Sequence, residues 1–210
     1  MPIRSAFYID GFNFYHAIDE LNDQSLKWCN LWALAQSIIP NVSESLVKVA
    51  FYSAFYPGTT QQRWRHEQYK HALENVGVET VFGHFIGEKM DCRGCGRNWN
   101  KPTEKETDIN LSLGVVGDAH TDLYDKAYIL SADSDQVATA RYVRVNFPQK
   151  LIATVAPPDR NFSNHITTLA NGGRIKLTKQ NIANSLFGGL VPSAIGGRAV
   201  IRPREYNPPP

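Results

Sequence analysis

The sequence predicts an α/β fold in which a mostly parallel central sheet lies between two layers of helices. The main observation is that short apolar runs alternate along the chain with longer segments of helical periodicity. This alternation is typical of β-α-β units, whose crossovers are right-handed and make the sheet parallel. A hydrophobic fraction of 42% is sufficient for a buried core, and a length of 210 residues fits one ordinary domain.

The predicted strands are short apolar segments, and several end at a turn signal. The first strand ends at Asp10-Gly11, and the second ends at Pro57-Gly58. Continuous apolar runs of this length, rich in Val, Ile, Phe and Tyr, indicate strands that are buried in a sheet. The predicted strands occupy residues 3–9, 46–56, 78–86, 127–130 and 151–155.

The predicted helices carry apolar residues at helical spacing. One of them stops at Pro40, which cannot continue a helix. Thr103 and Glu106 have the spacing of a capping box, so we expect another helix to begin near Thr103. Gly114 lies within that helix at a cost of ~1 kcal/mol relative to Ala, which indicates a close approach or the helix end. The helical segments start near Phe12 and then occupy residues 31–39, 60–75, 103–116, 136–145 and 163–169.

Two segments depart from the alternation. Residues 87–102 have no hydrophobic period, so we expect an insert within a domain that spans residues 1–187. Residues 188–210 are rich in glycine and proline and are expected to form a flexible tail without a core. The tail holds three arginines and one glutamate and so carries the whole net charge of +2. The neutral remainder gives no support to nucleic-acid binding on charge alone.

Composition also bears on the compartment. No run approaches the ~18 apolar residues that a membrane span needs, and residues 1–10 do not resemble a signal peptide. The three cysteines are an odd number, and two of them form a Cys-x-x-Cys pair, which argues against a disulfide framework. We therefore expect a cytoplasmic protein without membrane partners.

Several acidic residues fall where strands of the predicted sheet end. Asp10 follows the first strand, Asp133 and Asp135 follow the strand at 127–130, and Asp108 lies one predicted helical turn after Glu104. In open α/β sheets, ligands bind at the carboxyl ends of strands. Carboxylates gathered there repel one another, and Mg²⁺ or Mn²⁺ would relieve that repulsion. Each acid taken alone is better explained as a helix cap or a turn residue, whereas several acids at one edge of the sheet favour a metal site.

Three segments resemble motifs of the NYN family, a group of PIN-like nucleases. They are Y-I-D-G-F-N-F-Y from residue 8, E-K-E-T-D-I-N-L from residue 104, and Y-D-K-A-Y-I-L-S-A-D-S-D-Q-V from residue 124. The resemblance spans residues 7 to about 156 and implies a PIN-like three-layer sandwich that hydrolyses RNA with Mg²⁺ or Mn²⁺. It implies that Asp10, Asp108, Asp133 and Asp135 are the catalytic, metal-binding carboxylates, that Asn13 is a polar catalytic neighbour, and that Glu104 is an additional acid.

One departure from the family pattern concerns a fifth carboxylate. Related sequences often carry a further acid or a small helix residue after the middle motif, where this chain has Leu113-Gly114-Val115. Asp118 comes later and is interpreted as surface charge.

The Cys-x-x-Cys pair has the spacing of a zinc knuckle. Cys92 and Cys95 are followed by Gly96, which suits two thiolates that face one Zn²⁺. A structural zinc site needs four ligands, and the candidates for the others are His84 first, then His120 and Cys29. An unoccupied knuckle and a redox pair stay open as alternatives. Cys29 itself is interpreted as a core residue beside Trp28 and Trp32.

Candidate RNA contacts are basic residues near the acidic motifs. Arg63 and Arg65 begin a predicted helix, and Lys105 precedes Asp108. Such side chains could contact phosphates, although surface arginines are equally often in ordinary ion pairs. Trp99 in the insert could stack on a base.

Two other enzyme classes fit the sequence less well than a nuclease. A phosphatase with an aspartyl nucleophile needs Asp-x-Asp after an early strand, whereas the first strand here ends in Asp10-Gly11-Phe12-Asn13. The segment that follows the first strand also lacks the Gly-x-Gly-x-x-Gly motif of a dinucleotide-binding fold. A metal-dependent phosphatase and a non-catalytic module that binds RNA or protein stay as alternatives. The choice between RNA and DNA, a homodimer and an inhibitory protein partner are left open by the sequence.

Overall fold

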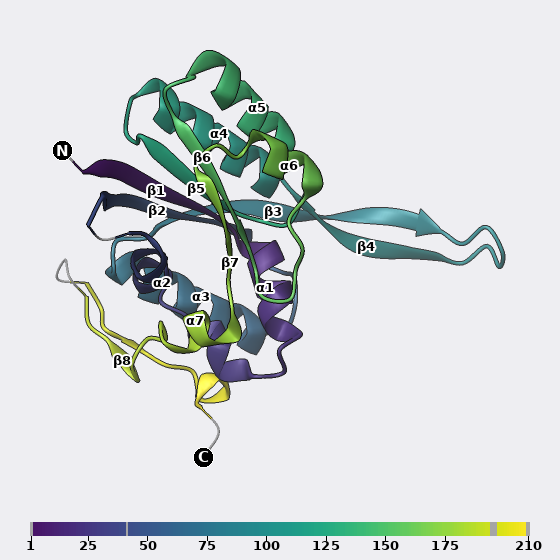
Figure 1. Ribbon diagram of the computed structural model, residues 1–210. Helices are drawn as coiled ribbons and strands as arrows, with labels where there is room; N and C mark the ends of the chain where they lie inside the picture. Colours follow the sequence, from purple (N-terminus) through teal and green to yellow (C-terminus); the bar gives the residue numbers. More distant parts are fainter. Residues whose placement is uncertain (1, 41, 194–196, 209–210) are drawn as a thin grey trace.

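The computed structural model describes residues 2–40, 42–193 and 197–208. Its centre is a seven-stranded sheet of order β4-β3-β2-β1-β5-β6-β7, in which every neighbouring pair is parallel except β3 and β4. This architecture confirms the predicted α/β fold with a mostly parallel sheet (Figure 1). The strands are β1 Ile3–Asp10, β2 Glu44–Ala54, β3 Glu79–Asp91, β4 Asn98–Lys105, β5 Lys126–Leu130, β6 Leu151–Ala156 and β7 Gly173–Lys176.

Helices cover both faces of the sheet and complete the three layers (Figure 1). One layer holds α1 Gly11–Asp19, α2 Leu31–Ile38, α3 Thr60–Asn75 and α7 Lys179–Ala183. The other layer holds α4 Thr107–His120, α5 Val137–Asn146 and α6 Asn164–Leu169. Two 3₁₀ segments, η1 Gln24–Trp28 and η2 Arg204–Tyr206, lie beside each other on the first side. Within the described part of the chain, no helix has the length and apolarity needed to cross a membrane.

Strand β1 shows why the apolar runs of the sequence become central strands. Its side chains alternate between the two faces of the sheet, as the pleat of a strand requires. Phe7 and Ile9 belong to the core under α1 and α2, whereas Ala6 and Tyr8 belong to the core under α4. Because both faces are covered, the strand is apolar at successive positions and not at every second one.

The strand order reverses beside β1. The chain runs outward from β1 through β2 to β3 and then returns to β5, on the other side of β1, before it continues to β6 and β7. Ile9 of β1 pairs with Leu130 of β5 at the last position of their ladder. The loops that follow these two strands therefore diverge, which opens space at the carboxyl edge of the sheet.

The start of α4 differs from the prediction. Residues 103–105 belong to β4, because the ladder with β3 extends to the pair His84–Lys105. The expected capping box of Thr103 and Glu106 is therefore not formed. Helix α4 begins at Thr107 after Glu106, whose φ is +79°. The carboxylate of Glu104 accepts from the Thr107 backbone N at 2.8 Å and supplies the missing cap.

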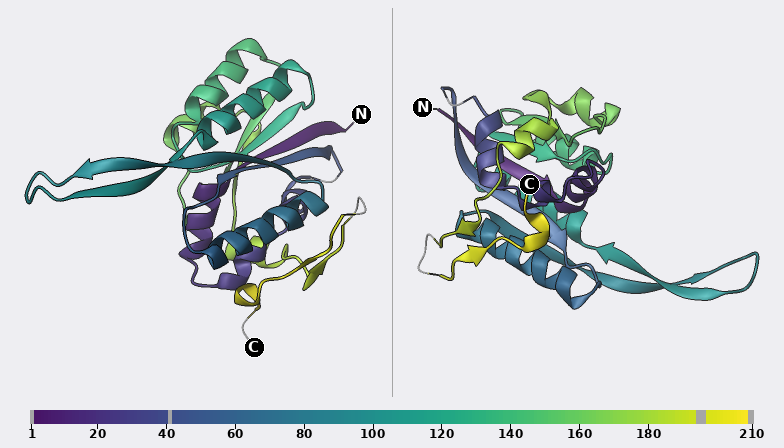
Figure 2. Two further views of the ribbon diagram at one scale, coloured as in Figure 1. Left: turned by 180° about the vertical axis from the view of Figure 1, so that it is seen from behind. Right: turned by 90° about the horizontal axis from the view of Figure 1, so that it is seen from below.

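The predicted insert is a β-hairpin that projects from the body, formed by the second half of β3 and by β4 (Figure 2). Most side chains of the hairpin are exposed on both of its faces, so no hydrophobic period marks it in the sequence. At its base, Gly83 lies so close to β4 that a Cβ would overlap the Lys105 carbonyl oxygen. Any larger residue there would push the two strands apart.

The predicted tail is packed against the body in its described part. Strands β8 Leu190–Val191 and β9 Val200–Ile201 form a second small sheet, and Val191 and Val200 are each 3% exposed. Trp28 donates from Nε1 to the Gly188 carbonyl at 3.1 Å. The expectation of a segment without a core is therefore wrong for these residues. Residues 194–196 and 209–210 of the predicted tail lie outside the described residues.

Gly114 marks a close approach, as its position within a helix indicates. An added Cβ would overlap Tyr52 Oη on β2 and would lie 2.9 Å from Tyr52 Cζ. Tyr52 Oη is buried and has no hydrogen-bond partner among the described residues. Helix α4 and strand β2 therefore come into contact where Gly114, which has no side chain, packs against the hydroxyl end of Tyr52.

We expect Gly114→Ala to lower the free energy of unfolding by about 1–3 kcal/mol, since overpacking outweighs the better helix propensity of Ala. Gly117→Ala, on the same helix with nothing within 4 Å of its Cβ, is the matched control and should be neutral or raise that free energy by up to about 1 kcal/mol. Urea unfolding of both variants measures the difference. Equal stability of the two variants would contradict the close contact, and Tyr52→Phe should recover part of the loss.

Candidate active site

Asp10 is the most buried acid at the carboxyl edge of the sheet, with 4% of its surface exposed. It is both the last residue of β1 and the N-cap of α1, where its carboxylate accepts from Asn13 N at 3.0 Å. The other oxygen accepts from Ser131 Oγ at 2.9 Å. Burial raises the pKa of Asp10 above its ordinary value, while these two hydrogen bonds act in the opposite direction.

The loop after β5 is held to α1 and β1 by side-chain contacts. Asn13 Oδ1 accepts from Ala132 N at 3.0 Å, and Ser131 Oγ accepts from Asp133 N at 3.0 Å. Asp135 N donates to Asp133 Oδ1 at 3.0 Å, which orients the two acids within the loop. Ser131 thus joins the buried Asp10 to the backbone of Asp133.

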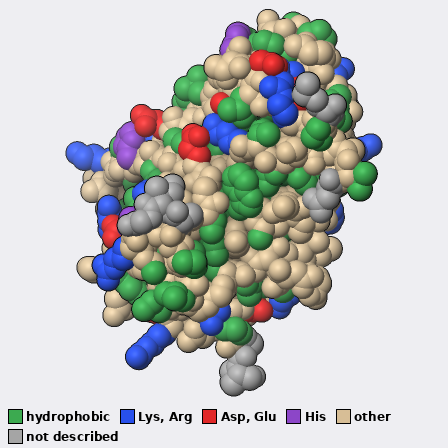
Figure 3. All heavy atoms as spheres, turned by 90° about the vertical axis from the view of Figure 1, so that its left-hand side faces the viewer, with side chains coloured by type: hydrophobic (Ala, Val, Ile, Leu, Met, Phe, Trp, Pro, Cys, Tyr) green, Lys and Arg blue, Asp and Glu red, His purple; other side chains and the backbone are tan. Residues whose placement is uncertain are grey.

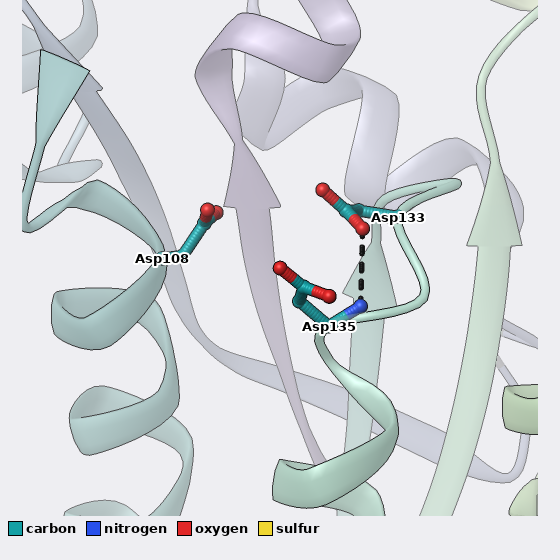
Figure 4. A group of neighbouring side chains, drawn as sticks. All are labelled: Asp108, Asp133 and Asp135. Atoms are coloured by element: carbon teal, nitrogen blue, oxygen red, sulfur yellow. Dashed lines mark hydrogen bonds between the residues drawn. The ribbon is translucent and has the colours of Figure 1, made fainter. Parts of the chain in front are cut away.

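Asp108 completes the group from the first turn of α4. It points toward Asp133 and Asp135 across the end of the sheet (Figure 4). One carboxylate oxygen from each of the three lies within 4.8 Å of the others. Asp10 is not a member of this close group, but it lies near enough for its charge to affect Asp108. The structure therefore brings three of the four predicted ligands together and places the fourth beside them.

The electrostatics of Asp108 reflect this crowding. Burial first, and then the charges of Asp10, Asp133, Glu104 and Asp135, raise its pKa to about 6. Glu104, the predicted additional acid, caps α4 through Thr107 and is not one of the three grouped carboxylates.

No cation within the described ranges neutralises the site. Asp10, Asp108, Asp133 and Asp135 form no ion pair there with a lysine or arginine, although acids elsewhere commonly do. Asp118, which the sequence suggested as surface charge, is one of the paired acids: Lys48 Nζ lies 2.8 Å from it and Tyr8 donates to it. Oxygen ligands with uncompensated negative charge suit a hard divalent cation. The residues present therefore fit Mg²⁺ or Mn²⁺.

The acids open into a cleft of about 1010 Å³. Asp10, Asp108 and Asp133 line it together with basic and aromatic side chains. The basic ones are Lys27, Arg63, Arg65, Lys101 and Arg160, and the aromatic ones include Phe12, Tyr15, Tyr56, Phe85 and Tyr206. On the side of the molecule opposite the hairpin, acidic and basic side chains are interspersed (Figure 3). Acidic and basic side chains also mix in the cleft, since Glu20 and Glu104 line it together with the aspartates.

The predicted RNA contacts are placed differently from one another. Arg63 and Arg65 line the cleft, where each also pairs with an acid: Arg63 with Glu67 at 3.0 Å and Arg65 with Glu205 at 2.9 Å. Lys105 does not line it and pairs with Glu88 at 2.8 Å across the hairpin. The sequence analysis missed Lys27 and Tyr56, which come from different elements and carry no motif that would have singled them out.

The Cys-x-x-Cys pair lies at the tip of the hairpin, far along the chain from the other candidate zinc ligands. His84, at the hairpin base, pairs with Glu106 at 3.3 Å. His120 packs on Phe147, and Cys29 is a fully buried core residue, as its sequence context predicts. Among the described residues, the acids at Asp108, Asp133 and Asp135 form the one group of three or more metal-ligating side chains. A four-ligand zinc site within one chain is therefore not assembled there.

The two thiols differ in environment. Hydrogen bonds from the Cys95 thiol and from the backbone N–H groups of Gly94 and Cys95 lower the pKa of Cys92 below its ordinary value. Burial raises the pKa of Cys29 far above its ordinary value, which leaves that thiol unreactive.

Comparisons with known proteins leave the family of this chain open. No known family profile matches it. The chain is 21% identical, over an alignment of 245 residues, to the 6-hydroxy-3-succinoylpyridine 3-monooxygenase HspA of Pseudomonas putida; the alignment covers 98% of this chain and 76% of that protein. A crystal structure of a protein of unknown function from Vibrio parahaemolyticus is similar with a TM-score of 0.55 and 18% identity, covering 85% of this chain and 94% of that one. This second likeness shows the fold alone.

Proposed function

We propose that this protein is a metal-dependent ribonuclease of the NYN type that hydrolyses phosphodiester bonds in RNA. The observation that carries the proposal is the convergence of Asp108, Asp133 and Asp135 without a neutralising cation at the point where the strand order reverses. Their position in a cleft lined by basic and aromatic side chains supports a nucleic-acid substrate. The motif resemblance adds the expectation of RNA cleavage.

Asp108, Asp133 and Asp135 would hold the metal. Asp10 is more deeply buried next to them and is not one of these three ligands. A divalent cation, when bound at such a site, activates water and stabilises the negative charge that develops on a phosphate. Asp10 acts through Ser131, which fixes the backbone position of Asp133. Asn13 is anchored through its Oδ1, and its NH₂ group has no hydrogen-bond partner in the described structure, so it can donate to a phosphate oxygen.

The side chains that line the cleft suit a single-stranded nucleic acid, which offers both charged phosphates and unstacked bases. Lys101 lines the cleft and forms no ion pair within the described part of the chain, so it can contact a phosphate, which positions a nucleic acid without reading its sequence. Lys27 and Arg160 also line the cleft, but they pair with Asp19 and Glu20. Exposed aromatic rings such as Tyr15 and Tyr56, at 45% and 54% exposure, can stack on bases. A folded duplex offers no unstacked bases for these rings.

The similarity to a monooxygenase supports a second candidate, an oxygenase that acts on a small aromatic compound, because it covers nearly the whole chain. An oxygenase that binds a dinucleotide would need a glycine-rich turn after the first strand, but the first strand here ends in the buried Asp10. Gly11 next to it is enclosed, since a Cβ would lie 2.6 Å from the Tyr52 carbonyl oxygen and 2.8 Å from the Phe51 ring. We therefore favour the nuclease.

We expect the protein to cleave a labelled single-stranded RNA in the presence of Mn²⁺ and to stop when EDTA is added. Asp108→Asn should lower the rate by at least about 100-fold, the scale on which loss of one electrostatic contributor acts. Asp91→Asn removes an exposed acid from the hairpin and should leave the rate unchanged. Full activity of Asp108→Asn would contradict the assignment.

The same assay separates the alternatives. Hydrolysis of p-nitrophenyl phosphate without RNA cleavage would indicate a phosphatase, and RNA binding without cleavage would indicate a non-catalytic module. A single-stranded DNA of the same sequence tests discrimination of the sugar.

The raised pKa of Asp108 makes a prediction about stability and pH in metal-free protein. Because the folded-state pKa of Asp108 is raised from 3.8 to about 6, the folded protein loses stability as the pH rises between these two values and keeps the full loss above about pH 6, where folding requires a charged group in a crowded site. Asp108→Asn should therefore raise the free energy of unfolding at pH 7.5 by up to about 2 kcal/mol, with no gain near pH 4 where Asp108 is protonated.

Thermal unfolding with and without Mn²⁺ measures both effects. Mn²⁺ should raise the melting temperature of the unmodified protein at pH 7.5 and lose this effect near pH 5, since the acids must be deprotonated to bind it. Asp108→Asn should show little shift, whereas Asp91→Asn should behave as the parent. A stabilising shift that persists unchanged at pH 5 would argue against these carboxylates as the ligands.

A further inference from the structure

The tip of the β3–β4 hairpin holds the two thiols in one turn. Cys92 N donates to Arg97 O at 2.8 Å, and Gly96 N donates to Cys92 O at 2.9 Å, so the turn closes on itself. Gly96 has a φ of +68°, which an L side chain rarely adopts. Two cysteines two residues apart, followed by a glycine, present their sulfurs to a single tetrahedral metal ion.

This arrangement supplies two of the four ligands that a structural zinc site needs. Cys92 and Cys95 are not grouped with a third histidine, cysteine or acid anywhere in the described ranges. His84 lies eight positions before Cys92 along β3, which corresponds to roughly 26 Å in an extended strand. The remaining cysteine, Cys29, is enclosed in the core. The described chain therefore cannot complete the site by itself.

The hairpin carries the turn away from the body of the molecule, where another molecule can reach it (Figure 2). We propose that Cys92 and Cys95 form half of a zinc site that the same two residues of a second copy of this chain complete. A two-fold axis through the ion would bring the two tips together, because a symmetric contact repeats the same ligands on both sides. Each copy would supply two thiolates to one tetrahedral centre.

The charge of the tip suits this arrangement. Four thiolates around Zn²⁺ leave a net negative charge, and Arg93 and Arg97 flank the thiols in each copy. Neither arginine forms an ion pair within the described part of the chain, and Asp91, next to Cys92, is the one acid among residues 90–101, which also hold Lys101. Without the metal, two such tips repel each other, so the association depends on zinc.

The proposed contact between two hairpin tips would also cover an apolar pair, Met90 and Trp99, that lies beside the cysteine turn. Trp99 is 49% exposed and lies directly across the hairpin from Met90. Opposed residues of an antiparallel pair share one face, so these two side chains form a small apolar surface two positions from the turn that Cys92 and Arg97 close. The second copy would cover that surface.

The experiment uses the full chain, reduced and freed of metal, before and after addition of ZnCl₂. We expect light scattering after gel filtration to show monomers without zinc and dimers with it, and elemental analysis to find one more zinc ion for every two chains than in a variant without the two cysteines. Co²⁺ in place of zinc should give the visible absorption bands of a tetrahedral cobalt–thiolate centre. A Cys92→Ser, Cys95→Ser double variant should stay monomeric and show no cobalt–thiolate bands, whether or not the carboxylates of the cleft bind metal.

Three results would overturn the inference: a cobalt–thiolate centre on a monomer, no cobalt–thiolate bands at equimolar metal, or a dimer that survives both chelation and the double variant. RNA cleavage by the double variant, measured separately with Mn²⁺, keeps this outcome distinct from that of the proposed nuclease. Because the hairpin tip is not among the residues of the acidic cleft, either proposal can fail alone.

Discussion

The parallel pairing of β1 with β5 is the constraint on which the candidate site depends. These two strands lie at the centre of the sheet with helices on both faces, and their ladder ends at Ile9 and Leu130. The next residues, Asp10 and Ser131, are therefore adjacent and joined by a hydrogen bond. Since the chain leaves β1 in one direction and β5 in the other, the two loops separate and expose the acids to the cleft.

A buried carboxylate at that point is costly unless its oxygens are satisfied. The fold satisfies Asp10 with an amide N–H of α1 and the hydroxyl of Ser131, both of which are fixed by the backbone. The acids nearer the solvent receive no such complete support, and Asp108 in particular is surrounded by like charges. The distribution of hydrogen bonds thus distinguishes an acid that organises the site from acids that are left free to bind a cation.

Helix ends and strand ends could be predicted from the sequence where neighbouring residues determine them. Helix α3 begins and ends at the predicted residues because Thr59 and Gln62 form a capping box and the segment is followed by Gly77. The acids could be assigned to one edge because the ends of parallel strands meet there. Strand β7 was missed, since it is an exposed edge strand of four residues without an apolar run.

Contacts between distant residues escaped prediction for a different reason. The described residues after Gly188 pack on the body through Trp28, 160 positions earlier, and no local composition reveals such a contact. The β3–β4 hairpin has no buried face and so no hydrophobic pattern. The basic and aromatic walls of the cleft come from α1, α3, the hairpin and the loop at Arg160, whose meeting depends on the whole fold.

The hairpin is continuous with the site through a very short connection. Strand β4 ends at Lys105, and Asp108 follows three residues later, after the Glu104 carboxylate has capped the intervening turn. At Gly83 the two strands meet without an intervening side chain. Only Glu106 and Thr107 separate the end of the exposed hairpin from Asp108, so an insertion or a deletion in this connection would displace the Asp108 carboxylate from those of Asp133 and Asp135.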